Sequence, residues 1–180
     1  MADVLAAAGP LPEGLLFEAP HVRVSAPPPQ PRWLLQGGLG AHAAVAAALG
    51  LPAPAALRAH ARDGLAMLWL GPDETLLVDA PQADVAAALA DVPHALVDVS
   101  DRDGALDVEG ADAETLLACA ILLDLHETAF PVSACARTLV GKAPALLWRR
   151  GPHAFRLLVP RSFAPYARDL LREGLHGLGD

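Results

Sequence analysis

The sequence predicts an α+β fold in which one unit, strand, helix, strand, strand, helix, occurs twice with mainly antiparallel strands. The strongest observation is a repeated hairpin, LWLGPDETLLV at residues 68–78 and LWRRGPHAFRLLV at residues 147–159. In each copy an apolar run stops at Gly-Pro and a few polar residues and then resumes, which is typical of strand, turn and strand. Two further observations agree: a helical pattern follows each hairpin, and a strand leading into a helix precedes it.

The first unit covers residues 33–92. It opens with RWLLQGG, which has the apolar run of a strand, and continues into the Ala-rich stretch LGAHAAVAAALG, which favours a helix. After the hairpin, DAPQADVAAALADV places Val85, Leu89 and Val92 on one helical face. The unit therefore ends in a second helix that packs on the sheet.

The second unit covers residues 105–175 and repeats this order. GALDVEG is a strand that enters the helical stretch ADAETLLACAILL through a junction of Gly and small residues. Ser162 is predicted to be the N-cap of the final helix, because its hydroxyl can accept a bond from a backbone amide of the first turn. The two units are joined by HALVDVSDRDG, in which Asp103-Gly104 predicts a tight turn. The apolar face of the final helix comprises Phe163, Ala167, Leu170 and Leu171.

The start of the chain predicts an extended, Pro-rich N-terminal arm over residues 1–32, ahead of a single globule at residues 33–180. Prolines fix an extended backbone and exclude helix. The arm is either a disordered leader or a segment that lies along a partner protein. The prolines that carry this prediction are Pro27, Pro28, Pro29 and Pro31.

The composition limits the possible functions. The chain has 180 residues, 53% of them apolar and 19% charged, which is typical of a folded globule. Its net charge of −8 argues against binding to nucleic acid or to an anionic membrane, since both require a concentrated positive field. The first residues lack a signal peptide pattern and no segment is apolar enough to span a membrane, so we expect a cytoplasmic protein. Cys119 and Cys135 fit neither a redox pair nor a metal motif and are expected to be buried thiols.

Five stretches in order, over about residues 33–175, resemble the gamma subunit family of heterotetrameric sarcosine oxidase. They are LWLGPDETLLVDAP, VDVSDR, LDVEGADAETLLA, FPVSACARTLVGKAPALLWR and FRLLVPRSFAPYARDLL. The VDVS, hairpin and G-x-D-A-E pattern is also similar to the folate-binding domain of aminomethyltransferases. This resemblance implies two ferredoxin-like halves related by pseudo-symmetry.

The resemblance also implies a function. Such bacterial complexes oxidise sarcosine to glycine in one-carbon metabolism, with FAD, FMN, NAD and tetrahydrofolate on other subunits. The implied role is a non-catalytic subunit without a cofactor, which supports assembly by packing chiefly on the large alpha subunit. The alternatives are a subunit of a related N-methylglutamate dehydrogenase and a freestanding tetrahydrofolate-binding or aminomethyltransferase-like protein. When isolated, such a chain can form a homodimer.

The residues themselves predict no catalytic or metal site. Seven His are scattered without ligand spacing. Asp124, His126 and Glu127 fit an exposed polar loop better than a metal site. Asp98 and Asp101, with Asp103, do not meet the spacing of a calcium loop and are expected to be turn and strand-end carboxylates.

A few residues remain as candidates for binding folate or another anion. The resemblance points to Asp98 or Asp101, because a carboxylate helps to hold the pterin in the folate-binding relatives. Arg137 is a further candidate, as are Arg161 and Ser162 near a helix N-terminus that favours negative charge. The favoured interpretation of all five is that they are solvated surface side chains.

GLGAHA at residues 38–43 fits the dinucleotide-binding pattern G-x-G-x-x-A, because it follows a strand and opens a helix. That site also requires a second parallel strand with an acidic residue about 20 positions on, where this chain has PAPAALRAHARDG. A helix N-terminus that needs small residues for close packing is the favoured interpretation, and a dinucleotide-binding enzyme is the alternative.

Overall fold

The computed structural model describes residues 9–53 and 55–177, which form two sheets of antiparallel strands with helices on their outer faces. The five-stranded sheet has the order β4-β5-β6-β3-β7, and the six-stranded sheet has the order β1-β2-β8-β11-β10-β9. The first sheet contains β3 (Arg32–Gly37), β4 (Ala59–Arg62), β5 (Leu65–Gly71), β6 (Glu74–Val78) and β7 (His94–Asp98). The second contains β1 (Gly14–Ala19), β2 (Val22–Ala26), β8 (Asp103–Glu109), β9 (Cys135–Val140), β10 (Ala143–Gly151) and β11 (Ala154–Pro160).

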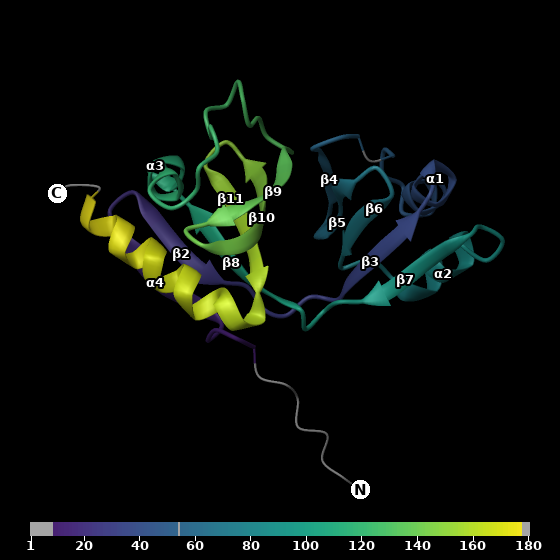
Figure 1. Cartoon of the computed structure of the whole chain (residues 1–180), viewed down its shortest axis with the longest axis horizontal. Coiled ribbons are helices and arrows are strands. Elements are labelled where there is room, and N and C mark those ends of the chain that lie inside the picture. The colour runs from purple at the N-terminus through teal and green to yellow at the C-terminus, as the bar shows by residue number, and fades with distance from the viewer. Residues whose placement is uncertain (1–8, 54, 178–180) are drawn as a thin grey trace, which may run out of the picture.

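Helices cover the outer faces of the two sheets, and the inner faces of the sheets meet (Figure 1). The helices are α1 (Leu39–Ala48), α2 (Gln82–Ala88), α3 (Ala113–Ala118) and α4 (Ala164–Gly174), with short 3-10 turns η1 (Arg161–Phe163) and η2 (Leu175–Gly177) around α4. Three apolar clusters result: one under α1 and α2, one under α3 and α4, and one between the sheets. None of the helices in the described ranges has the length and apolar character that a membrane crossing requires.

The order of elements agrees with the predicted doubled unit. The first unit is β3-α1-β4-β5-β6-α2 and the second is β8-α3-β9-β10-β11-α4, and the strands lie in matching orders, β4-β5-β6-β3 and β9-β10-β11-β8. Each unit contains one strand more than the sequence predicts, β4 in the first and β9 in the second. Both were missed because their residues, AHAR and CARTLV, lack a continuous apolar run.

Equivalent residues of the two similar hairpins do not point to the same face of their sheets. Leu68 faces the other sheet, whereas its counterpart in the repeat, Leu147, faces the helices. Leu77 faces the helices, whereas Leu158 faces the other sheet. Both faces of both hairpins are buried, so apolar residues are needed on either side and do not specify which side faces inward.

The N-terminal segment contains a hairpin that the sequence does not predict. β1 and β2 pair with each other, and β2 also pairs with β8, so residues 14–26 are part of the six-stranded sheet. This corrects the expectation of an extended arm over residues 1–32 for these residues. Residues 27–31, in the Pro-rich link to β3, lack regular secondary structure as expected from their prolines, and so do residues 9–13. The first eight residues of the predicted arm lie outside the described part of the chain.

The turn between the units also differs from the prediction. Arg102 N donates to the carbonyl oxygen of Val99 at 3.1 Å, so the turn precedes Asp103, the first residue of β8. Gly104 lies within the strand, where an added Cβ would be 2.7 Å from Pro10 Cγ and 2.9 Å from Ala164 Cβ. The glycine is therefore required by close packing and not by a turn.

Candidate functional site

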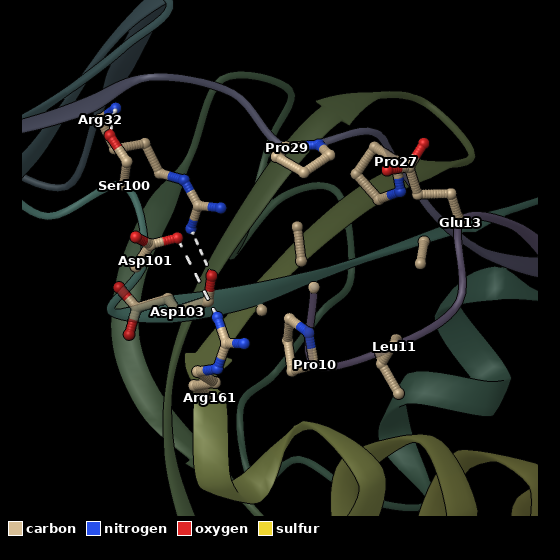
Figure 2. A pocket seen from close by; sticks show the side chains of 14 residues that line it. Pro10, Leu11, Glu13, Pro27, Pro29, Arg32, Ser100, Asp101, Asp103 and Arg161 are labelled. Carbon is tan, nitrogen blue, oxygen red and sulfur yellow. Dashed lines mark hydrogen bonds and ion pairs between the residues drawn. The ribbon is translucent and has the colours of Figure 1, made fainter. Parts of the chain in front are cut away.

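A small pocket lies where the segment before β1 and the Pro-rich link approach the turn between β7 and β8 (Figure 2). Its volume is about 50 Å³. One wall is polar and the opposite wall is built largely from proline rings. The polar wall comprises Arg32, Ser100, Asp101, Asp103 and Arg161, and the apolar wall includes Pro10, Leu11, Pro27 and Pro29.

Arg32 is the most buried charged group of this pocket. The residue is 6% exposed, and its Nη1 donates to the carbonyl oxygen of Asp103 at 2.9 Å. Burial lowers the pKa of Arg32, and the nearby charge of Asp103 opposes that shift. An arginine remains protonated even so, and the pocket therefore contains a largely desolvated cation.

Arg161 lies on the same polar wall as Arg32, near Asp101 (Figure 2). Its Nη1 is 4.0 Å from Asp101 Oδ1, and the Asp101 side chain is 82% exposed. The carboxylate of Asp103 is bound to Arg102 at 2.9 Å. The carboxylates on this wall therefore have basic neighbours, and solvent screens Asp101.

Two guanidinium groups and three carboxylates line the pocket, so the charge of the lining does not select an anion by itself. The carboxylates are those of Glu13, Asp101 and Asp103. A drug-sized ligand such as a folate needs about 300 Å³ or more, which this pocket does not provide. Ser100 Oγ donates to Asp98 Oδ1 at 2.6 Å and accepts from Arg32 N at 3.0 Å, and both bonds hold the turn in place.

The five predicted anion candidates do not form one site. Asp101 and Arg161 line the pocket, whereas Arg137 lies in a separate groove and pairs with Glu74 at 2.5 Å. Asp98 accepts two bonds from Ser100, which lower the pKa of Asp98 and make it a turn residue.

Ser162 is exposed within η1, and the prediction that it caps the last helix is wrong. α4 begins at Ala164 after Phe163, and neither η1 nor α4 has a side-chain cap. A 3-10 turn that leads directly into α4 moves the start of the helix past the serine.

The polar residues around His126 form an exposed loop, as the sequence indicates. Asp124 Oδ1 accepts from His126 N at 3.0 Å, and His126 Nδ1 is 2.9 Å from Thr128 Oγ1. Across the described residues, no group of three or more His, Cys, Asp or Glu side chains lies close enough together to hold a metal ion.

The glycines of the pattern at residues 38–43 serve neither a dinucleotide site nor close packing, which corrects the favoured interpretation. All paired strands of the described sheets are antiparallel, so α1 does not connect two parallel strands as a dinucleotide site requires. An added Cβ at Gly37 would be 2.8 Å from Ala41 Cβ, whereas Gly38 and Gly40 have open space. His42 is a structural tie, with Nε2 2.9 Å from the carbonyl oxygen of Gly37 and Nδ1 2.9 Å from Thr75 Oγ1.

A buried ionic network in the six-stranded sheet was missed by the sequence analysis. Arg156 donates to both oxygens of Asp107 at 2.6 and 2.7 Å, and to Gln30 Oε1 at 2.7 Å. Arg150 adds a bond to Asp107 at 3.0 Å. A usable signal was present, because Asp107 and Arg156 are each flanked by apolar residues within a strand. The two residues are directly opposite in the ladder.

Arg149, the neighbour of Arg150, is a second buried cation that sequence reasoning missed. It donates to the carbonyl oxygens of Leu125, Phe130 and Pro152 at 2.9, 3.0 and 2.7 Å. These bonds attach the long loop between α3 and β9 to the sheet. Its function is structural, since its two Nη groups donate to backbone carbonyls, while Nε is buried without a hydrogen-bond partner.

The two cysteines differ in environment, although both were expected to be buried. Cys135 is fully buried, and its Sγ donates to the carbonyl oxygen of Trp69 at 3.4 Å. Burial raises the pKa of Cys135 to about 11. Cys119 is exposed, which corrects the expectation for this thiol.

Residues 38–174 match the family described as "Sarcosine oxidase, gamma subunit family". The chain belongs to this family. Among proteins named sarcosine oxidase subunit gamma, it is 37% identical to that of Corynebacterium sp. (strain P-1) over 72% of this chain. It is 39% identical to that of Arthrobacter sp. over 70% of this chain. These matches span 66% and 64% of the relatives' own lengths.

Solved structures agree with membership of the sarcosine oxidase gamma subunit family. A chain of the heterotetrameric sarcosine oxidase from Corynebacterium sp. U-96, in complex with pyrrole 2-carboxylate, has a TM-score of 0.81 and 30% identity. The match covers 88% of this chain and 86% of that chain. The glycine cleavage system aminomethyltransferase T from Bartonella henselae has a TM-score of 0.58 and 16% identity, covering 84% of this chain and 45% of that one. The latter likeness concerns the fold alone and agrees with the folate-domain-like architecture implied by the sequence.

Proposed function

We propose that this chain is a non-catalytic subunit of a heterotetrameric sarcosine oxidase and supports its assembly in the oxidative demethylation of sarcosine to glycine. The observation that carries the proposal is the match over 88% of this chain to one chain of a heterotetrameric sarcosine oxidase. In this proposal the larger subunits, chiefly the alpha subunit, are the partners in the cytoplasm. FAD, FMN, NAD and tetrahydrofolate are bound by those subunits and not by this chain.

The pocket around Arg32 has a volume of about 50 Å³, which is too small for a flavin, a dinucleotide or a folate. Of the five candidate residues for binding folate or another anion, Asp101 and Arg161 line this pocket, and Asp98, Arg137 and Ser162 lie outside it. We also expect the isolated chain to self-associate when the larger subunits are absent.

The experiment is affinity capture of the tagged full chain from an extract of its own cells. The expected result is co-purification of larger subunits with flavin absorbance, and sarcosine oxidation by the captured complex but not by the isolated chain. Capture without any flavoprotein would contradict the proposal. Turnover of N-methylglutamate in place of sarcosine would assign the chain to the related dehydrogenase complex.

A freestanding tetrahydrofolate-binding protein is the second candidate, favoured only by the likeness of fold to an aminomethyltransferase. It predicts saturable binding of tetrahydrofolate by the isolated chain in calorimetry. The first proposal predicts no such binding, so one titration separates the two.

A further inference from the structure

The outer edge of β7 carries backbone groups that have no strand to bind. β7 pairs with β3 on one side and is the last strand of its sheet. Val99 N donates to the carbonyl oxygen of Arg32 at 2.8 Å, and this bond sets the alternation of the β3–β7 ladder. By that alternation the N–H and C=O groups of His94, Leu96 and Asp98 point away from β3.

The other edge strands have features that hinder pairing with another chain. β1 contains a register shift between Leu15 and Phe17, and β4 has only four residues. β9 is flanked on its outer side by bridges from Ile121 to Val140 and from Arg58 to Ala134. These are the usual protections of sheet edges.

β7 has none of these features within its described residues. Its sequence, HALVD, contains no proline or lysine, and its pairing with β3 is continuous. Four of its five residues are exposed, and the Val97 side chain is 50% exposed. An apolar, regular and uncovered edge of this kind is a template for another strand.

The sequence of β7 is complementary to itself when a second copy runs antiparallel about Leu96. In that register His94 lies opposite Asp98 of the second copy at both ends, and Ala95 lies opposite Val97. Opposite charges and apolar residues that face each other across strands both stabilise pairing. The same register pairs the outward backbone groups of His94, Leu96 and Asp98 with one another.

The side chains at the two ends are available for this contact. The carbonyl oxygen of Val92 accepts from His94 Nδ1 at 2.7 Å, so Nε2 can donate to a partner's carboxylate when the ring is protonated. Asp98 uses Oδ1 for both bonds to Ser100, which leaves Oδ2. We propose that two copies of this chain pair through β7, antiparallel and centred on Leu96, so that their five-stranded sheets form one continuous sheet.

This pairing is independent of the proposed role in sarcosine oxidation, because it is measured on the isolated full chain. A single short strand buries less area than a stable interface does, so the dimer is weak and its population depends on concentration. Sedimentation velocity from about 5 µM to about 1 mM is therefore the appropriate measurement. The expected result is a shift from monomer to dimer, without larger species, because the two-fold contact is closed.

Val97→Lys places a charge in the edge and is expected to leave the chain monomeric at every concentration. Leu139→Lys is the matched control, because Leu139 is 51% exposed on the other edge strand β9, and it is expected to dimerise as the unaltered chain does. Thermal melting of both variants reports whether each is folded. A monomeric unaltered chain, or a dimer insensitive to Val97→Lys, would overturn the proposal.

Charge substitutions at His94 test the register and do not rely on Val97→Lys. His94→Asp faces Asp98 of the second copy and is expected to weaken the dimer about tenfold, whereas His94→Lys places a lasting positive charge opposite Asp98 and is expected to dimerise at least as well. Equal dimerisation of the two variants would exclude this register. If the chain is monomeric and Val97→Lys instead prevents capture by larger subunits, a different protein binds β7 and self-pairing is wrong.

Discussion

The two units of the molecule bury different polar groups within the same arrangement of strands. In the unit of the five-stranded sheet, the buried hydrogen-bonded side-chain pair is His42 with Thr75, and the buried cation Arg32 donates to the carbonyl oxygen of Asp103. In the unit of the six-stranded sheet, a carboxylate is bound by two arginines, Asp107 with Arg156 and Arg150. The shared topology therefore does not require a particular polar interior. The units differ in the loss of unfolding free energy that is expected when one member of each network is removed. A buried charge without its counter-charge costs far more than an unsatisfied hydrogen-bonding group.

The largest expected effect comes from removing the carboxylate of the ionic network. Asp107→Ala leaves the buried Arg156 without its counter-charge and is expected to lower the free energy of unfolding by about 3–5 kcal/mol. Urea denaturation of the purified chain measures this loss. Asp169→Ala is the control, because Asp169 pairs with Arg168 on the exposed surface and its removal should leave the free energy of unfolding close to that of the unaltered chain. Equal losses of unfolding free energy in the two variants would show that burial does not determine how much the Asp107 network stabilises the fold.

The next effect concerns the contact between the units, where Cys135 of β9 donates to Trp69 of β5. The Cys135 thiol has an ordinary pKa of 9.0 in the unfolded chain and about 11 in the folded one. Its contribution is therefore fully present below pH 9 and is lost as the pH rises toward 11, amounting to about 2–3 kcal/mol. Cys135→Ala should remove that part of the pH dependence from the unfolding curves. An unchanged slope would contradict burial of this thiol.

Breaking the His42–Thr75 pair of the first unit should lower the free energy of unfolding less than Asp107→Ala does. Thr75→Val keeps the shape of the side chain but removes the hydroxyl beside His42, and it is expected to cost about 1–2 kcal/mol in urea denaturation. Thr115→Val, at an exposed position of α3, is the matched control and should be close to neutral. A loss at Thr75 as large as that at Asp107 would remove the distinction between the units.

The smallest expected effect is at the ion pair that joins the units on the surface. Arg137 is 54% exposed where it meets Glu74, so solvent and salt screen the interaction. A double-mutant cycle with Arg137→Ala and Glu74→Ala should give a coupling free energy of about 0.5 kcal/mol that declines in high salt. Coupling above about 2 kcal/mol would mean that this contact, and not the apolar cluster between the sheets, holds the units together.

The order of the elements was predictable from the sequence, because Gly-Pro turns and alternating helical patterns are local signals. β4 and β9 were not predictable in the same way. Their pairing is set by tertiary neighbours, since Ala59 N donates to the carbonyl oxygen of Ser133 and Cys135 N to that of Leu57. The sequence also did not predict which side chains of the hairpins point to the helices and which to the other sheet. A strand buried on both sides, such as the one around Leu147, has no polar residues that identify its outer face.

The pocket was predictable only in part. Asp101 was singled out by the resemblance to folate-binding relatives and Arg161 by its position before a helix, and the two side chains do meet. Arg32 was missed, because an arginine after a proline run looks solvated until the N-terminal segment covers it. Such long-range coverage leaves no local pattern, and for the same reason the hairpin of β1 and β2 was interpreted as an arm.

Co-expression of the larger subunits with and without this chain, followed by purification and assay of sarcosine oxidation, tests its role in assembly. We expect that the full chain is incorporated with flavin-containing subunits, that the complex forms poorly without it, and that the chain alone does not oxidise sarcosine. Sarcosine oxidation by the purified chain, or a complete and stable complex formed in its absence, would contradict its role as an assembly subunit.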